Sequence, residues 1–485
     1  MTRRFSRRAA LGGLGALLAS GSLADTISAS PRPPRRPRGA GVPSIDALIA
    51  RARLDGVVTF AVFDAADGRL LEARDGRRGQ PPASSLKAVT AAYAHDRLGA
   101  DHRFVTRLLG RGAARDGILR GDLLLAGGGD PTLDTPRLAR LAAALGERGV
   151  RGVEGRLTTH SGALPFVAKV DPDQADHLGY NPAVSGLNLN FNRVHFSWER
   201  TGGRYLVSLD ARAGDYAPAI TSARMRIEPR RLPVYTYRQA DGVDEWTVAR
   251  DALGPAGSRW LPVRNPPRYA ADVMGALARS SGVAMPIGGE VEAAEGEELA
   301  RVASAPLLDV TAEMLRYSTN LTAEALGLAA SGGAGLEASA GAMTAWAGRA
   351  LGMRGARLVD HSGLNEETRV SAEAMAGAMV RLTPVHPVAR RMKPFGMRDR
   401  QGRPMDHPVR VAAKTGTLNF VSALAGFAEP PSGRTLAFAV FASDLPRRAA
   451  AAERGDEVPE GARAWNRQAK ALQQSLVERW AALYG

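Results

Sequence analysis

The pattern of apolar and polar positions predicts strands close to both ends of the chain. Residues 57–63 and 70–73 flank the turn Asp67-Gly68, which predicts an N-terminal hairpin. Residues 417–427 and 436–442 predict two further strands around a turn that contains Pro and Gly. The strands from the two ends are therefore expected to belong to one α/β domain.

Apolar residues at helical spacing predict the helices of this domain. The stretch that follows Pro81-Pro82 is predicted to be helical, and amphipathic runs cover 307–315 and 321–326. The last helix carries its apolar residues at intervals of three and four, on one face: Trp465, Ala469, Leu472, Leu476, Trp480 and Leu483. Packing onto the sheet is the expected role of that face, and contact with a membrane surface is the alternative.

The middle of the chain is predicted to be an insertion into this domain. Residues 43–102 and 304–485 form the α/β domain, and residues 103–303 lie between its two parts. The insertion is rich in short β-like runs separated by Gly and Pro, at 157–159, 204–209 and 224–227. A domain can be inserted where its entry and exit points lie close together.

The N-terminus predicts export. Four arginines (residues 3, 4, 7 and 8) precede an apolar stretch at 9–19, and small residues lead to Ala24. Eleven apolar residues are too few to span a bilayer, which takes ~20, but they suit a signal peptide cleaved near Ala24. The arginines resemble a twin-arginine signal, and an arginine-rich Sec signal is the alternative. Residues 25–42 are a Pro/Arg-rich linker, and the expected location is the periplasm.

Composition narrows the classes of function. The 485 residues are 45% hydrophobic and 23% charged, as in an ordinary globular protein, and include no cysteine, which excludes disulfides and thiol nucleophiles. Without the four arginines of the predicted signal peptide, the net charge falls from +15 to +11. This charge favours anionic partners of the cell envelope, including peripheral contact with an anionic membrane surface. No nucleic-acid recognition module is visible, and the sequence does not predict the oligomeric state.

Three short motifs carry candidate chemistry. Ser84 and Lys87 lie three residues apart on a predicted helix, so that an amine can accept the proton of a hydroxyl. Ser318-Thr319-Asn320 lies between two amphipathic runs, and Lys414-Thr415-Gly416-Thr417 is predicted to open a strand. In this order the motifs S-x-x-K, S-x-N and K-T-G are the signature of penicillin-binding proteins and serine β-lactamases.

Longer segments of the sequence indicate which family within this group the chain resembles. The stretches GDLLLAGGGDPTL (121–133), LNLNFN (187–192) and DHSGL (360–364), with 230 residues between Lys87 and Ser318, resemble the D-alanyl-D-alanine carboxypeptidase/endopeptidase family, the class C low-molecular-mass penicillin-binding proteins. The resemblance implies a β-lactamase/transpeptidase-like α/β catalytic domain with a large, mostly β insertion, divided into two small domains, after the serine helix. Peptidoglycan peptides and covalent β-lactams are the implied partners.

The resemblance also implies a role for each motif residue. Ser84 would be the nucleophile and Lys87 its base, with the pKa of Lys87 lowered by burial and by the nearby cation Lys414. Ser318 would relay a proton and Asn320 would hold the substrate amide. Lys414, Thr415, Gly416 and Thr417 would bind the terminal carboxylate, and the N–H groups of Ser84 and Thr417 would form the oxyanion hole. No cofactor is implied, and the eight histidines lack the spacing of metal ligands.

One residue departs from the pattern of the family, and two alternative functions remain open. Many members of the family that the chain resembles carry Arg where this chain has Glu366, and Arg369 is a candidate to substitute for that cation. Asp360 and Ser362 are predicted to build a structural turn beside the site. A class C-like β-lactamase or esterase is the nearest alternative function, although such enzymes usually carry Tyr at the position of Ser318. A non-catalytic peptidoglycan-binding protein is the other alternative.

Overall fold

The α/β domain is built on a sheet that joins the two ends of the chain. The computed structural model describes residues 41–332, 335–399, 401–454 and 457–485. The predicted signal peptide and nearly all of the predicted linker lie outside these residues. The sheet is antiparallel and its strand order is β19 (Arg410–Leu418), β20 (Val421–Glu429), β21 (Leu436–Ser443), β1 (Val57–Asp64) and β2 (Leu70–Arg74). Apart from Glu429 at the end of β20, β20 and β21 consist of apolar and small residues because both of their faces are buried.

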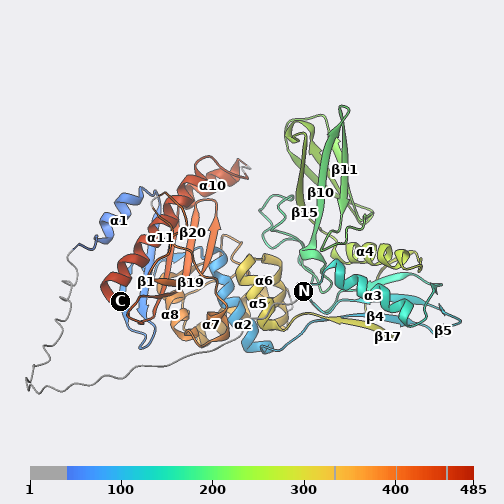
Figure 1. Ribbon diagram of the computed structural model, residues 1–485, viewed down its shortest axis with the longest axis horizontal. Helices are drawn as coiled ribbons and strands as arrows, with labels where there is room; N and C mark the ends of the chain where they lie inside the picture. The colour runs from blue at the N-terminus through green and yellow to red at the C-terminus, as the bar shows by residue number, and fades with distance from the viewer. Residues whose placement is uncertain (1–40, 333–334, 400, 455–456) are drawn as a thin grey trace, which may run out of the picture. The chain divides into compact units, whose positions relative to one another are not determined.

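Helices cover both faces of this sheet (Figure 1). α11 (Ala462–Tyr484) and α1 (Ile45–Ala52) pack on one face, where the Trp480 ring packs at a tilt against Phe60 and Phe438. The apolar stripe of the last helix therefore packs on the sheet, as predicted. The opposite face is covered by a second core that includes α2 (Lys87–Leu98) and α8 (Ala372–Leu382).

One strand boundary differs from the prediction. The sequence pattern predicts a single strand over 417–427, but β19 ends at Leu418 and β20 begins at Val421. The two residues between them form the hairpin turn, in which Phe420 has a φ of +57°. The K-T-G motif therefore lies inside a strand of its own. This strand is at the edge of the sheet, and its mixture of Lys, Thr, Gly and Ala does not show the apolar pattern that a buried strand would.

The segment between the two parts of the α/β domain contains a second five-stranded sheet. Its strand order is β16 (Ile287–Glu290), β9 (Leu157–His160), β7 (Asp122–Ala126), β4 (Val105–Arg111) and β17 (Glu297–Ala303). The first and last long strands of the segment, β4 and β17, are antiparallel neighbours. The chain therefore enters and leaves this segment at adjacent positions.

Three further three-stranded sheets and two helices belong to this segment, and the smallest sheet is formed by the two-residue strands β5 (Ala114–Arg115), β6 (Ile118–Leu119) and β8 (Gly152–Val153). The two larger sheets are β11 (Arg204–Asp210), β10 (Arg193–Thr201) and β15 (Ala256–Pro262), and β12 (Ala223–Glu228), β14 (Val243–Ala249) and β13 (Tyr235–Ala240); the helices are α3 (Thr135–Glu147) and α4 (Pro266–Ser280). The strands that the sequence predicts at 157–159, 204–209 and 224–227 correspond to β9, β11 and β12, so these three predictions are confirmed.

The remaining elements are short or belong to the α/β domain. The helices are α5 (Leu307–Tyr317), α6 (Asn320–Ser331), α7 (Leu336–Ala350), α9 (Pro387–Arg390), α10 (Leu445–Glu453) and the 3₁₀ turns η1 (Ala83–Leu86), η2 (Asn190–Asn192) and η3 (Arg250–Ala252). The strands are β3 (Gly79–Gln80) and β18 (Val370–Ser371). No helix within the described ranges combines the length and apolar character that crossing a membrane requires.

Candidate active site

The S-x-x-K motif occupies the junction between a 3₁₀ turn and an α-helix. Ser84 lies in η1, and Lys87 is the first residue of α2. The prediction of one continuous helix is therefore corrected: Ala83, which precedes the serine, has a φ of +44° and is fully buried. The spacing of three residues nevertheless places the Lys87 amine 2.9 Å from Ser84 Oγ. The two groups are thus within hydrogen-bonding distance, as the sequence predicts.

The second motif lies between α5 and α6. Ser318 ends α5 in the left-handed conformation, with a φ of +62°, and Asn320 begins α6. Asn320 Oδ1 accepts a hydrogen bond from Lys87 Nζ at 2.7 Å, and its Nδ2 donates to the carbonyl of Tyr180 at 2.8 Å. Both ends of the Asn320 amide are therefore held, and one of them holds Lys87.

The third motif reaches the site from β19. Lys414 Nζ donates to Ser318 Oγ at 2.9 Å and to the carbonyl of Thr415 at 2.7 Å. Thr415 and Thr417 alternate with Lys414 and Gly416 along the strand and have exposed side chains. The structure thus links Ser84, Lys87 and Asn320 in one set of hydrogen bonds, and Ser318 and Lys414 in another.

The pairing of β19 determines where its backbone N–H groups point. Ala413 N donates to Lys393 O, and Phe395 N donates to Val411 O, on the side of β19 that faces away from β20. Because this alternation has a period of two in an antiparallel pair, the N–H groups of Thr415 and Thr417 point to the same open edge.

Gly416 brings this strand against the serine turn. A Cβ atom at position 416 would lie 2.8 Å from Ala83 Cβ and 2.9 Å from both Pro82 O and Ser84 N. No larger side chain fits there without moving the turn. Gly363 makes a second close approach, since its Cβ would lie 2.0 Å from Ala83 O, and it has a φ of +73°.

The two lysines of the site are buried. Burial lowers the pKa of Lys87 to about 8, although the negative charges of Asp360 and Glu324 raise it. Burial, followed by the positive charges of Lys87 and Lys393, lowers the pKa of Lys414 to about 6. Burial is therefore the main reason for the lowered pKa of both amines, as expected from the sequence for Lys87, and the repulsion between the two amines contributes to the low pKa of Lys414.

A turn that follows α7 lies behind Lys87. The Asp360 carboxylate accepts hydrogen bonds from the N–H groups of Leu364 and Asn365 and from the hydroxyls of Ser362 and Thr368. Burial, together with the charge of Glu324, raises the pKa of Asp360 to about 6. Asp360 therefore supports the turn, as predicted, and Ser362 contributes its carbonyl, which accepts from Lys87 Nζ at 2.8 Å.

Sequence reasoning missed a buried carboxylate in this region. Glu324 lies four residues after Asn320 on α6 and is fully buried. It accepts hydrogen bonds from the backbone N–H groups of His361 and Ser362 and from the His361 ring. The spacing of four was an available signal, because it places Glu324 on the same helix face as Asn320.

Glu366 is paired within the protein. Arg448 of α10, which is mostly buried, donates from Nε to the Glu366 carboxylate at 3.1 Å. Arg369 donates instead to the backbone carbonyls of Glu366 and Thr368. Arg448 thus neutralises the Glu366 carboxylate.

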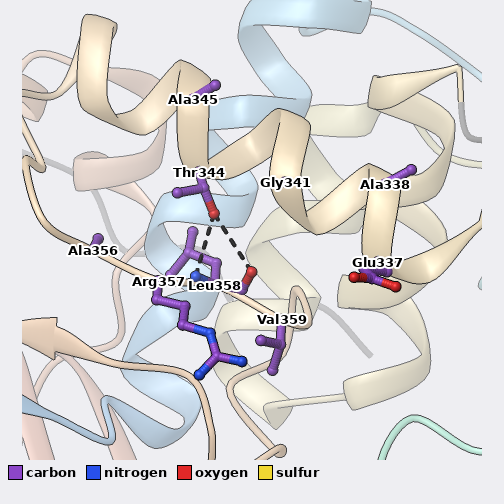
Figure 2. A pocket seen from close by; sticks show the side chains of 9 residues that line it. All are labelled: Glu337, Ala338, Gly341, Thr344, Ala345, Ala356, Arg357, Leu358 and Val359. Atoms are coloured by element: carbon purple, nitrogen blue, oxygen red, sulfur yellow. Dashed lines mark hydrogen bonds between the residues drawn. The ribbon is translucent and has the colours of Figure 1, made fainter.

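A shallow depression of about 740 Å³ lies elsewhere on the domain (Figure 2). Its lining comes from α7 and the segment after it: Glu337, Ala338, Gly341, Thr344, Ala345, Ala356, Arg357, Leu358 and Val359. None of the motif residues is among them. Within the described parts of the chain, no cluster of His, Asp and Glu could hold a metal ion.

The chain is similar to known peptidases over most of its length. It is 29% identical to a D-alanyl-D-alanine carboxypeptidase of Actinomadura sp. (strain R39) over 435 residues, which cover 82% of this chain and 79% of the relative. It is 25% identical to the D-alanyl-D-alanine carboxypeptidase DacB of Haemophilus influenzae, over 74% of this chain and 79% of the relative.

Solved structures and a family profile agree with these relatives. The crystal structure of penicillin binding protein 4 (DacB) from H. influenzae covers 90% of this chain and 99% of its own, with a TM-score of 0.72 and 19% identity, which shows the same multi-domain fold. The profile of the D-Ala-D-Ala carboxypeptidase 3 (S13) family matches residues 42–459, a range that contains all three motifs. The chain therefore belongs to the D-Ala-D-Ala carboxypeptidase 3 family of serine peptidases.

Proposed function

We propose that the protein is a DD-peptidase that cleaves peptidoglycan stem peptides through an acyl-enzyme on Ser84. It releases the terminal D-alanine, cleaves D-alanyl cross-links, or both. The observation that carries this proposal is the geometry of Lys87, whose amine lies 2.9 Å from Ser84 Oγ while two fixed acceptors hold it from other directions. An amine in that position can take the hydroxyl proton as the serine attacks.

The proposed mechanism assigns one step to each of these groups. Ser84 Oγ bonds to the substrate carbonyl carbon, and its proton passes to Lys87 Nζ. The N–H groups of Ser84 and Thr417 stabilise the oxyanion, in keeping with the open edge of β19 beside the serine turn. The C–N bond then breaks, and the leaving amine takes the proton held by Lys87; Ser318, whose hydroxyl accepts a hydrogen bond from Lys414 in the structure, is the proposed relay. Water, activated by Lys87, finally hydrolyses the ester and restores Ser84.

The third motif binds the substrate in this proposal. Lys414, Thr415 and Thr417 receive the terminal carboxylate at the open edge of β19, and Gly416 allows that edge to approach the serine turn. Asn320 binds the substrate amide in this proposal. In addition it holds Lys87, because its side-chain oxygen accepts a hydrogen bond from the amine.

Benzylpenicillin tests the proposal directly. We expect it to acylate the purified protein on Ser84, because its strained amide is attacked by the same hydroxyl, and we expect the adduct to turn over slowly. Intact-protein mass spectrometry follows the adduct, and peptide mapping locates it, with the Ser84→Ala variant as the control. Rapid hydrolysis of the β-lactam would instead indicate a β-lactamase. An adduct at another residue, or none at all, would contradict the proposed role of Ser84.

The pKa values of the two lysines predict a pH dependence that differs between substrates. A substrate without a terminal carboxylate needs only neutral Lys87, so kcat/KM should rise through about pH 8. A substrate with that carboxylate also needs charged Lys414, whose pKa is about 6. Its kcat/KM should therefore be bell-shaped, with limbs at about pH 6 and pH 8 and a maximum near neutrality.

An acyl-D-alanine thioester with a neutral leaving group and a D-alanyl-D-alanine peptide form the matched pair of substrates. The chain has no cysteine, so a released thiol is measured without interference from the protein. A bell-shaped profile for the thioester, or the same rising profile for both substrates, would contradict the prediction that charged Lys414 binds the carboxylate.

We further propose that the protein is exported and acts in the periplasm. The basic and apolar pattern of residues 1–24 supports export, and peptidoglycan lies outside the cytoplasm. The twin-arginine route is the proposed one. A net positive charge would draw the protein to the anionic cell wall and membrane surface.

A further inference from the structure

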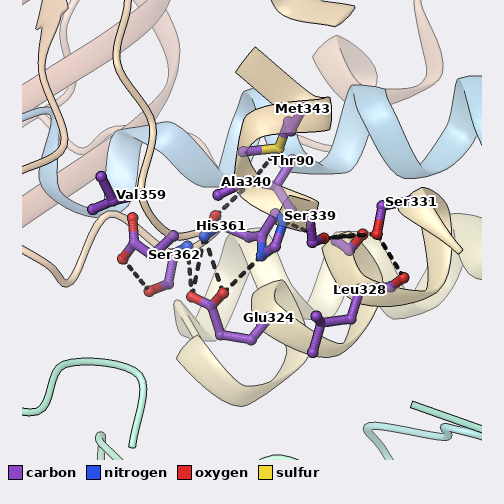
Figure 3. Close-up of polar contacts among 12 residues, drawn as sticks. Thr90, Glu324, Leu328, Ser331, Ser339, Ala340, Met343, Val359, His361 and Ser362 are labelled. Carbon is purple, nitrogen blue, oxygen red and sulfur yellow. Dashed lines mark hydrogen bonds and ion pairs between the residues drawn. The ribbon is translucent and has the colours of Figure 1, made fainter. Parts of the chain in front are cut away.

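Three polar side chains form a buried chain beside the site (Figure 3). Glu324 Oε2 lies 2.8 Å from His361 Nδ1, and His361 Nε2 lies 3.0 Å from Ser339 Oγ. Burial acts to raise the pKa of Glu324, but its hydrogen bonds with His361 and Ser362 lower it below its usual value. Glu324 is therefore an ionised carboxylate in the protein interior.

This order of carboxylate, imidazole and hydroxyl is that of a hydrolytic triad. A hydrolytic triad must be open to its substrate, but here Glu324 and His361 are fully buried and Ser339 is 1% exposed. The depression of Figure 2 is lined by neighbouring residues of α7, and Ser339 is not among them. The three residues are thus sealed from substrates and do not form a second hydrolytic site.

The Glu324 carboxylate fixes a short piece of backbone. His361 N donates to Oε2 at 3.0 Å and Ser362 N donates to Oε1 at 2.9 Å. The imidazole occupies space that Gly327 leaves open on α6, where a Cβ would lie 2.0 Å from the ring. Thr90 of α2 donates to the His361 carbonyl at 2.5 Å. Residues 361 and 362 are therefore held from α2, α6 and α7.

The fixed backbone ends at the amine of Lys87. The Ser362 carbonyl and Asn320 Oδ1 can only accept hydrogen bonds, so they engage two N–H bonds of neutral Lys87. The remaining tetrahedral direction, which holds the lone pair, then points to Ser84 Oγ. We infer that Glu324, together with His361, is a positioning residue for Lys87 that acts by fixing the Ser362 carbonyl.

Charge adds a second effect of Glu324. Several charged or hydrogen-bonding groups surround the Lys87 amine: Ser84 from η1, Asn320 and Glu324 from α6, Asp360 and Ser362 from the turn, and Lys414 from β19. Burial weakens Lys87 as a base, and the charge of Glu324 restores part of its basicity. The inference rests on the proposed role of Lys87 as the base.

The Glu324→Gln variant tests both effects with the neutral thioester across pH. The amide of Gln presents only one oxygen to the two N–H groups and carries no charge. We expect the high-pH plateau of kcat/KM to fall about 10- to 100-fold because Lys87 is misplaced. We also expect the acid limb to move to lower pH by up to about one unit.

Two further variants separate positioning from general damage to the core. Glu324→Asp keeps the charge but shortens the side chain, so its acid limb should stay in place while its plateau falls. Asp272 is the matched control, since it is a buried carboxylate that accepts from the backbone N–H groups of Thr221 and Ser222 in the inserted segment. Asp272→Asn should lower the melting temperature and leave the pH profile of catalysis unchanged.

Each outcome distinguishes this inference from the proposed function. If the Lys87→Ala variant keeps the wild-type activity, the proposed function fails. If Lys87→Ala loses activity but Glu324→Gln keeps the wild-type plateau and acid limb, only the positioning role fails. If Glu324→Gln does not fold, Glu324→Asp decides: an unchanged plateau would overturn the inference.

Discussion

The Lys87→Arg variant should lose acylation of Ser84 by at least about 10³-fold while it keeps the native fold. A guanidinium stays protonated at any accessible pH, so it cannot accept the serine proton. It can still donate to Asn320 Oδ1 and the Ser362 carbonyl, which now accept from the amine. The loss should therefore appear in the rate and not in the circular dichroism spectrum.

The measurement is the time course of benzylpenicillin adduct formation by intact-protein mass spectrometry. Lys470→Arg is the matched control, because Lys470 is exposed on α11 and the same change of residue there should leave the rate unchanged. A Lys87→Arg variant that is acylated at close to the wild-type rate would require another base. Lys414 would then be the first candidate, through its hydrogen bond to Ser318.

The second large effect is expected from Gly416→Ala. The added methyl group would lie 2.8 Å from Ala83 Cβ and 2.9 Å from Ser84 N, and these atoms cannot swing away as the end of a flexible side chain can. Either β19 or the serine turn must move. We expect about a 100-fold loss of acylation rate and a decrease of about 1–3 kcal/mol in the free energy of unfolding.

Adduct formation and thermal melting measure the two effects separately. Gly377→Ala in α8 is the control, since nothing lies within 4 Å of its added Cβ and alanine favours a helix. It should match or slightly exceed the wild type in stability, with an unchanged acylation rate. If Gly416→Ala retained the wild-type rate, the close approach of β19 to Ser84 would not be needed for catalysis.

The motif residues could be predicted because their chemistry is local in sequence. Ser84 and Lys87 meet through a spacing of three, and Lys414 is marked by the two residues that follow it. The Ser362 carbonyl is a backbone group, which every residue possesses, so no residue type identifies it. The pairing of Arg448 with Glu366 joins residues 82 positions apart, and only the packing of α10 brings them together.

The fold was predicted where side chains are buried on a regular pattern. The first strand of the N-terminal hairpin, β1, and the stripe of α11 are examples, because each buries a continuous apolar set. β19 was not separated from β20 for the opposite reason. A strand that lines a binding site must keep polar and small residues, and these obscure the alternation that identifies a strand.

The edge position of β19 has a consequence for self-association. An open strand edge that can receive a peptide can also pair with the edge of a second protein molecule. Residues 393–395 cover the first half of the edge through their hydrogen bonds to Val411 and Ala413. Over the part of the chain that the structure describes, no strand pairs with Thr415 or Thr417 on that side. The open stretch is short compared with the five or six residues of a typical paired strand, so pairing with the edge of a second molecule would form few hydrogen bonds.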